Sequence, residues 1–171
     1  MRLSGKGMPG WDRLRQLWID WFMYLLDTNV LSELVRARPH PQVLARFESS
    51  SSEDLFTSAV CIEEIRFGCR LVPEGEAKWR KVAAKVLVRV TVVEFDYQAA
   101  VRAGELRAEW KQKGTPVGYT DGFIAATALA ADCILVTRNT RHFDHVNGLL
   151  VENWFESPPN PTSENLIADS R

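Results

Sequence analysis

The sequence has few cysteines, the residues that form disulfides and thiolate metal sites. It contains three cysteines, Cys61, Cys69 and Cys133, an odd number without a CxxC pair. This pattern argues against a disulfide framework and makes a zinc site built on thiolates unexpected. We expect three reduced, mostly buried thiols, as in a cytoplasmic protein.

The sequence also lacks long apolar runs and an excess of either charge. No stretch approaches the roughly 20 apolar residues of a membrane-spanning helix, and charged residues interrupt the N-terminal region where a signal peptide would lie. The 21 Lys and Arg residues nearly balance the 22 Asp and Glu residues, so the net charge is −1. Proteins that bind nucleic acid through phosphate contacts alone are usually much more basic. Contact with nucleic acid would therefore require a local basic patch or a metal ion.

The composition that remains fits one soluble domain, because 171 residues, 46% of them hydrophobic, suffice for a sizeable core. We predict that residues 23–155 form this domain and that residues 156–171 form a flexible tail. Residues 1–22 hold three of the six tryptophans. This segment is either an amphipathic helix that docks on the domain or on a partner, or an upstream extension of a domain that began at Met23.

Strand-like and helix-like patterns alternate along the predicted domain. Strands are predicted at 23–27, 55–57, 90–95, 133–137 and 149–151. Helices are predicted at 29–36, 41–49, 59–72, 75–87, 97–113 and 121–131, and Gly114 is expected to end the fifth of them. This alternation predicts an α/β fold whose mostly parallel sheet is covered by helices on both faces.

The most informative feature is the apolar run 24–26, which stops abruptly at Asp27. Such a run predicts a buried strand, and Asp27 then lies at its carboxyl end, where open α/β sheets bind ligands. Thr28 or Asn29 is expected to cap the helix that follows. A carboxylate placed there can hold a divalent cation if other acids converge on it.

Helical geometry separates two adjacent acids, Glu63 and Glu64. The apolar residues of this helix form a broad arc that we expect to be buried. The arc consists of Val60, Cys61, Ile62, Ile65, Phe67, Leu71 and Val72. Glu64 falls within it, whereas Glu63 points to the opposite side as an ordinary solvated acid. Because a carboxylate in apolar surroundings needs a cation or hydrogen-bond donors, Glu64 is either a metal ligand or a side chain whose head reaches solvent.

Two further polar residues lie where they could join Asp27. Asp121 opens an apolar, alanine-rich helix; it either interacts favourably with the helix dipole or belongs to a site. Asn139 follows the strand at 133–137, so it is expected at the same sheet edge as Asp27, as a site residue, a turn residue or a helix cap.

Basic residues surround this second strand end. Arg138 and Arg141 give the edge positive charge, as contacts to phosphate would require. His142 and His145 form an HxxH pair, but their spacing and the lack of a third nearby histidine argue against zinc.

Taken in chain order, four motifs resemble those of PIN domains, and most nearly those of the VapC and FitB toxins of bacterial toxin–antitoxin systems. The motifs are Leu26-Asp27-Thr28-Asn29, Glu64-Ile65-Arg66-Phe67-Gly68, Asp121-Gly122-Phe123-Ile124-Ala125-Ala126-Thr127-Ala128 and Val136-Thr137-Arg138-Asn139-Thr140. Each motif alone is weak, but the four together at this spacing are specific. The resemblance covers the chain from Met23 to about Trp154.

The resemblance implies a three-layer PIN-like fold and a set of site residues. Asp27, Glu64 and Asp121 would be the catalytic, metal-binding carboxylates. Thr28, Asn29 and Thr137 would support the site. Many relatives carry an aspartate at a fourth position, where this chain has the neutral Asn139.

The implied chemistry is hydrolysis of RNA. Oxygen ligands without His or Cys favour Mg²⁺ or Mn²⁺, and such an ion can activate water and neutralise charge on a phosphodiester. The products would carry a 5′-phosphate and a 3′-hydroxyl. Implied partners are the RNA substrate, a VapB-like or FitA-like antitoxin and a second copy of the chain, without any membrane.

Two other functions compete with a ribonuclease toxin. The chain could be a binding protein with little intrinsic cleavage that acts through an antitoxin complex occupying DNA, a reading that Asn139 and the near-neutral charge favour. It could also be a phosphotransfer module with Asp27 as acceptor, but no suitably placed lysine accompanies the strand-end acids.

Overall fold

A five-stranded parallel sheet in the order β3-β2-β1-β4-β5 forms the centre of the computed structural model, which describes residues 22–114 and 118–157. The strands are β1 (Tyr24–Leu26), β2 (Leu55–Ser58), β3 (Thr91–Val93), β4 (Ile134–Val136) and β5 (Val151–Glu152). All four pairs of neighbouring strands are parallel. The prediction of a mostly parallel α/β sheet is therefore confirmed.

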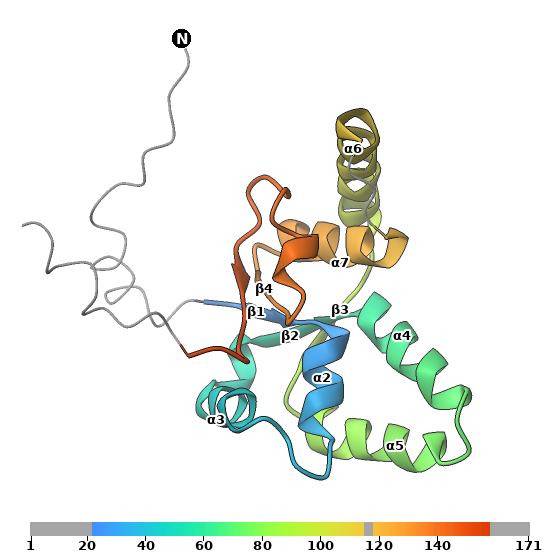
Figure 1. The fold of residues 1–171 in the computed structure, drawn as a ribbon, viewed down its shortest axis with the longest axis vertical. Coiled ribbons are helices and arrows are strands. Elements are labelled where there is room, and N and C mark those ends of the chain that lie inside the picture. Colours follow the sequence, from blue (N-terminus) through green and yellow to red (C-terminus); the bar gives the residue numbers. More distant parts are fainter. Residues whose placement is uncertain (1–21, 115–117, 158–171) are drawn as a thin grey trace, which may run out of the picture.

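Helices cover both faces of this sheet, which gives three layers (Figure 1). They are α2 (Thr28–Leu34), α3 (Pro41–Ser49), α4 (Ala59–Arg70), α5 (Gly75–Val82), α6 (Tyr97–Lys113) and α7 (Tyr119–Ala130). In Figure 1, α6 and α7 lie above the sheet and α2, α3 and α5 lie below it. A π-helical turn, Ala83–Leu87, extends α5, and short 3-10 turns occupy Ser52–Asp54 and Thr140–His142.

Strands β1 and β4 and most of α7 are buried because their sequences are apolar on nearly every side. Leu25 in β1 and Leu135 in β4 are completely inaccessible to solvent. Along α7, small residues allow close packing against α6: a side chain at Gly122 would begin 3.1 Å from the buried Trp110 ring. The prediction that α6 stops at Gly114 is confirmed, since this residue adopts the left-handed conformation with φ of 69°.

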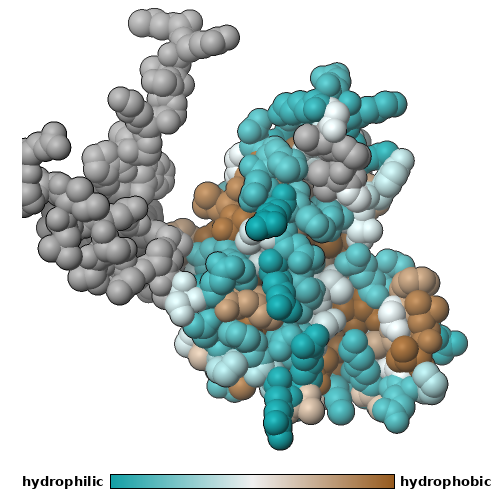
Figure 2. All heavy atoms as spheres, viewed as in Figure 1, coloured by the Kyte–Doolittle hydropathy of each residue, from teal (hydrophilic) through white to brown (hydrophobic). Residues whose placement is uncertain are grey.

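Two local predictions were wrong. The cap of α2 is neither Thr28 nor Asn29 but Asp27, whose carboxylate accepts a hydrogen bond from the Thr28 amide because the helix already begins at Thr28. The apolar arc of α4 is only partly buried: Phe67 and Leu71 are 60% and 67% exposed. Figure 2 shows this end of α4 as an apolar patch at the right edge of the molecule.

The other expectations concern the cysteines, the membrane and the chain ends. All three cysteines are free and buried, as predicted, and burial raises the pKa of Cys61 to about 12. Among the described helices, none has the length and apolar character needed to cross a membrane. The predicted N-terminal extension, except for Phe22, and most of the predicted tail lie outside the described residues, so both remain predictions.

Candidate active site at the carboxyl end of the sheet

Asp27 is delivered to the edge of the sheet by β1 and held there by donors from two elements. Its amide donates to the Val136 carbonyl of β4 at 3.0 Å, which continues the β1–β4 ladder to the last residue before α2. The side chain is only 6% exposed. One carboxylate oxygen accepts from the Thr28 amide at 2.6 Å, and the other accepts from the Thr137 hydroxyl at 2.6 Å and from the Asn29 amide group. The carboxylate therefore has one fixed orientation.

The predicted supporting residues form a network around this carboxylate. The Asn29 side chain also donates to the Thr137 hydroxyl at 2.9 Å, and its carbonyl oxygen accepts from the Arg138 amide at 3.0 Å. The backbone amide of Asn139 donates to the same Thr137 hydroxyl at 3.1 Å. These bonds connect the ends of β1 and β4 directly, because the two strands are neighbours in the sheet.

Glu64 reaches the site from α4. Its carboxylate accepts a hydrogen bond from the Thr28 hydroxyl, 36 residues away in sequence. Glu64 is half-buried, whereas the adjacent Glu63 is exposed. Helical phase therefore distinguished the two acids correctly by burial, and the contact with Thr28 places only Glu64 beside the strand end.

Asp121 approaches from the first turn of α7, where its side chain meets His142. The His142 Nδ1 atom lies 3.0 Å from one Asp121 carboxylate oxygen. Sequence reasoning weighed His142 only as half of an HxxH pair and missed this contact. The one available signal was its position, three residues beyond Asn139 at the end of β4.

Burial and neighbouring acids both raise the pKa values of Asp27 and Glu64. Burial is the main cause that raises the pKa of Asp27, and the charge of Asp121 raises it further, against the lowering effect of the Thr137, Thr28 and Asn29 hydrogen bonds. Burial likewise raises the pKa of Glu64, with added repulsion from Asp27 and Asp121. Within the part of the chain that the structure describes, no basic side chain forms an ion pair with Asp27 or Glu64.

This donor set fits a hard divalent cation. Carboxylate oxygens surrounded by hydroxyl and amide groups, without a thiolate, are the ligands that Mg²⁺ and Mn²⁺ prefer, and a cation would relieve the repulsion among the acids. Across residues 22–114 and 118–157, no three acidic, His or Cys side chains are gathered tightly enough to form a complete ligand cluster. The acids are thus adjacent, but they are not drawn together around one point.

The remaining predicted residues lie at the rim. Asn139 precedes the turn Thr140–His142, and its exposed side chain makes no capping hydrogen bond there. The Arg138 guanidinium lies over the Phe155 ring, 5.1 Å from its centroid. Arg141 is exposed on the same turn. Of the two arginines, Arg138 is linked to the strand end beside Asp27, because its backbone amide donates to the Asn29 side chain.

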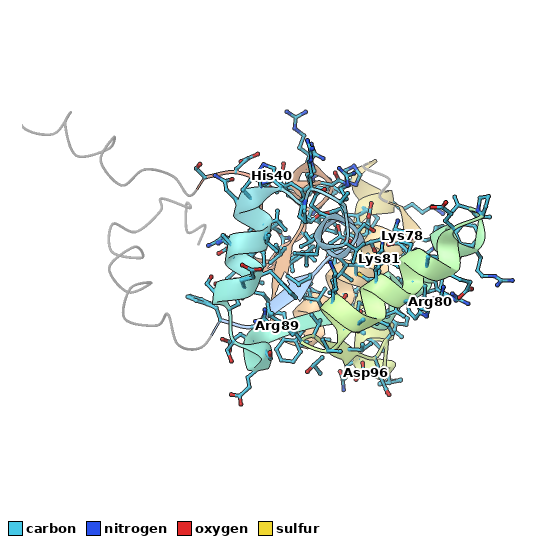
Figure 3. The ribbon with its side chains drawn as sticks, turned by 90° about the horizontal axis from the view of Figure 1, so that it is seen from below. His40, Lys78, Arg80, Lys81, Arg89 and Asp96 are labelled. Atoms are coloured by element: carbon cyan, nitrogen blue, oxygen red, sulfur yellow. The ribbon has the colours of Figure 1, made fainter. Side chains whose placement is uncertain are left out.

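A separate hollow lies between α2 and α5 and contains none of the three acids. Its volume is about 650 Å³, and its lining includes Val35, Arg36, Val72, Lys78 and Lys81. Figure 3 shows Lys78 and Lys81 pointing from α5 toward the centre of the molecule, with Arg80 on the other side of the helix. This surface is basic and partly apolar, in contrast to the acidic strand end.

Comparison with known proteins places this geometry in a family. The sequence model of the PIN domain matches residues 24–149. The VapC ribonuclease Y4jK of Sinorhizobium fredii is 35% identical over 137 residues, covering 77% of this chain and 98% of the relative. Toxin FitB of Neisseria gonorrhoeae is 31% identical over 139 residues, covering 78% and 100%.

A solved structure agrees with the sequence comparison. The DNA-bound VapBC of Salmonella typhimurium superposes with a TM-score of 0.71 at 30% identity, covering 78% of this chain and 99% of that chain. The residues matched by the PIN model include Asp27, Glu64, Asp121 and Asn139.

Proposed function

The chain belongs to the PIN domain family, among relatives of the VapC and FitB toxins, and we propose that it is a Mg²⁺- or Mn²⁺-dependent endoribonuclease, the toxin of a toxin–antitoxin pair. The observation that supports this proposal is that Asp27, Glu64 and Asp121 come from three separate elements, yet lie close enough for the charge of Asp121 to raise the pKa of the other two. Asp27 in turn raises the pKa of Glu64, and within the described residues no basic side chain forms an ion pair with Asp27 or Glu64.

Each residue of the candidate site has a proposed role in RNA hydrolysis. Asp27, Glu64 and Asp121 would hold the ion, and the hydroxyls of Thr137 and Thr28 keep the first two carboxylates oriented. When bound, the ion would activate the attacking water and neutralise charge on the phosphodiester. Arg138 and Arg141 stand at the rim, where they would contact neighbouring phosphates. Asn139 would contribute a neutral carbonyl oxygen there without adding repulsion.

Metal removal tests this proposal directly. We expect the purified chain to cleave total RNA in Mg²⁺ or Mn²⁺, to lose this activity completely in EDTA and to regain it when the metal is restored, since three carboxylates repel phosphate without a cation. The new 5′ ends should be degraded by a 5′-phosphate-dependent exonuclease. Cleavage that persists in EDTA, or products without a 5′-phosphate, would contradict a metal-activated water.

The second part of the proposal is a VapB-like or FitA-like antitoxin as protein partner. The solved VapBC relative from Salmonella typhimurium is a complex bound to DNA. In this chain, Phe67 and Leu71 are 60% and 67% exposed and lie three and seven residues beyond Glu64, on the same face of α4. An apolar surface of this kind is typical of protein interfaces. A partner that covers it would also block the approach to Glu64. A homodimer in the cytoplasm remains our expectation for the free toxin.

Substitutions on this face should weaken antitoxin binding. We expect Phe67→Glu and Leu71→Glu each to raise the Kd for the antitoxin encoded beside the gene by about tenfold or more, because burying a charge in an interface is costly. Isothermal titration calorimetry measures the effect. The control is Val88→Glu, which adds the same charge at a valine that is 70% exposed in the turn after Ala83–Leu87. If all three variants bind like the wild type, the antitoxin does not occupy this face of α4.

A further inference from the structure

The contact between His142 and Asp121 joins two distant segments at the proposed metal site. The two residues are 21 positions apart, one in the turn after β4 and the other in the first turn of α7. The turn is anchored by the next residue, Phe143. This residue is only 1% exposed, and its amide donates to the Thr140 carbonyl at 2.9 Å. The imidazole is thus presented to Asp121 by an anchored backbone.

The Asp121 carboxylate is otherwise loosely held. Gly118, the residue that precedes α7, has no side chain to cap the helix. A Cβ at that position would lie 3.5 Å from the same carboxylate oxygen that faces His142, so the carboxylate leans back over Gly118. Asp27 has three donors and Glu64 has the Thr28 hydroxyl, whereas the His142 ring nitrogen is the one side-chain partner of Asp121 within the described residues.

We propose that His142 is a positioning residue: its Nδ1–H group holds one oxygen of Asp121 and leaves the other directed at the cation. This inference rests on the proposed metal site. An N–H group that restrains the second oxygen of a carboxylate ligand fixes the rotamer needed for coordination, and loss of such an outer partner typically costs 10–100-fold in metal affinity. The donor is available in the Nδ1–H tautomer as well as in the charged imidazole.

The competing explanation is an ordinary surface pair without function. The side chains of His142 and Asp121 are 54% and 30% exposed, and pairs of this exposure contribute little to stability. The two explanations differ in what they predict for metal binding, since a surface pair of this kind would have no effect on it.

Binding of Mn²⁺ to the full-length chain, followed by electron paramagnetic resonance of the free ion, decides between them without reference to RNA cleavage. We expect His142→Leu to weaken Mn²⁺ binding by about tenfold or more. His142→Asn should recover most of the affinity, because the asparagine amide can replace Nδ1 as donor. The matched control is His145→Leu, at an exposed histidine three residues away with no polar partner among the described residues.

The outcomes separate this inference from the proposed function. If His142→Leu binds Mn²⁺ as the wild type does, or if His145→Leu loses affinity equally, the positioning role is wrong while the metal site stands. If the wild-type chain binds no Mn²⁺, the metal site itself is wrong. Thermal unfolding in EDTA guards against misfolding, since loss of an exposed pair should leave the Tm of His142→Leu nearly unchanged.

Discussion

Replacing Asp27 by asparagine is expected to lower RNA cleavage at least about a hundredfold and to abolish growth inhibition on induced expression. An ion held by these acids would supply several kcal/mol to the transition state, and each loss of about 1.4 kcal/mol costs a factor of ten in rate. Asp27 is the most enclosed of the three acids and is 6% exposed. An amide at this position removes one negative charge while the steric fit beside Thr28 and Thr137 is nearly preserved. Gel assays of RNA cleavage in Mg²⁺ measure the effect.

A matched pair of glutamates provides the control. Glu64→Gln should reduce cleavage in the same way, because Glu64 contacts Thr28 at the site. Glu63→Gln removes an identical charge from the neighbouring residue, which is exposed, and should leave cleavage within about twofold of the wild type because exposed charges are screened. The comparison thus separates a ligand effect from a general change in charge.

Other outcomes would change the assignment. If toxicity and cleavage survive Asp27→Asn, the metal-nuclease proposal fails. If the wild-type chain and Asp27→Asn are equally inactive but bind the antitoxin tightly, the chain is a binding protein that acts through its complex. Asn139, which brings no charge to the site, would then be part of the explanation.

Gly75→Ala is expected to destabilise the protein by about 3 kcal/mol, which corresponds to a fall in Tm of roughly 10 °C for a domain of this size. Gly75 is buried at the start of α5. A Cβ there would lie 1.5 Å from the Cys69 carbonyl oxygen and 2.4 Å from its carbonyl carbon. Since the obstacle is backbone of α4, no side-chain rotation relieves the clash, and the α4–α5 turn must open. Thermal unfolding followed by circular dichroism measures the loss.

A glycine-to-alanine substitution where a Cβ has free space should instead stabilise the protein. Gly104 lies in the middle of α6, and nothing lies within 4 Å of a Cβ built there. Gly104→Ala should therefore stabilise the protein by up to about 1 kcal/mol, since alanine is the better helix former. If Gly75→Ala unfolds at the wild-type temperature, the close approach of α5 to the Cys69 carbonyl is not a constraint on the fold.

Much of the fold follows from local patterns in the sequence. The apolar runs that form β1 and β4, the alanine-rich run of α7 and the end of α6 at Gly114 were identified because these signals depend only on neighbouring residues. The two errors were also local in origin. The acid at the end of β1 was assigned to a site and not considered as a cap, although one carboxylate can serve both purposes. Apolar residues of α4 were assumed to be covered by the chain itself, and Phe67 and Leu71 are not.

The sequence likewise identified some residues of the candidate site and missed others. Helical phase distinguished Glu64 from Glu63 because both lie on one helix, and the strand end identified Asp27. Asp121 was selected mainly by its resemblance to a family motif, since an acid in a first helical turn has a sufficient explanation in the helix dipole. The position of His142 shortly after β4 was the one signal for a place near the site, and it did not indicate Asp121 as the partner.

The sequence by itself determined which segments form strands and helices and which acids end up at their termini, because burial and hydrogen bonding of short segments are properties of adjacent residues. Only the tertiary structure decided which of these termini meet. The order β2-β1-β4 brings Thr137 to Asp27 and, through the helices that follow the strands, brings Glu64 to Thr28 and His142 to Asp121. Strand order depends on how all the apolar faces are buried at once, and no local pattern along the chain records it.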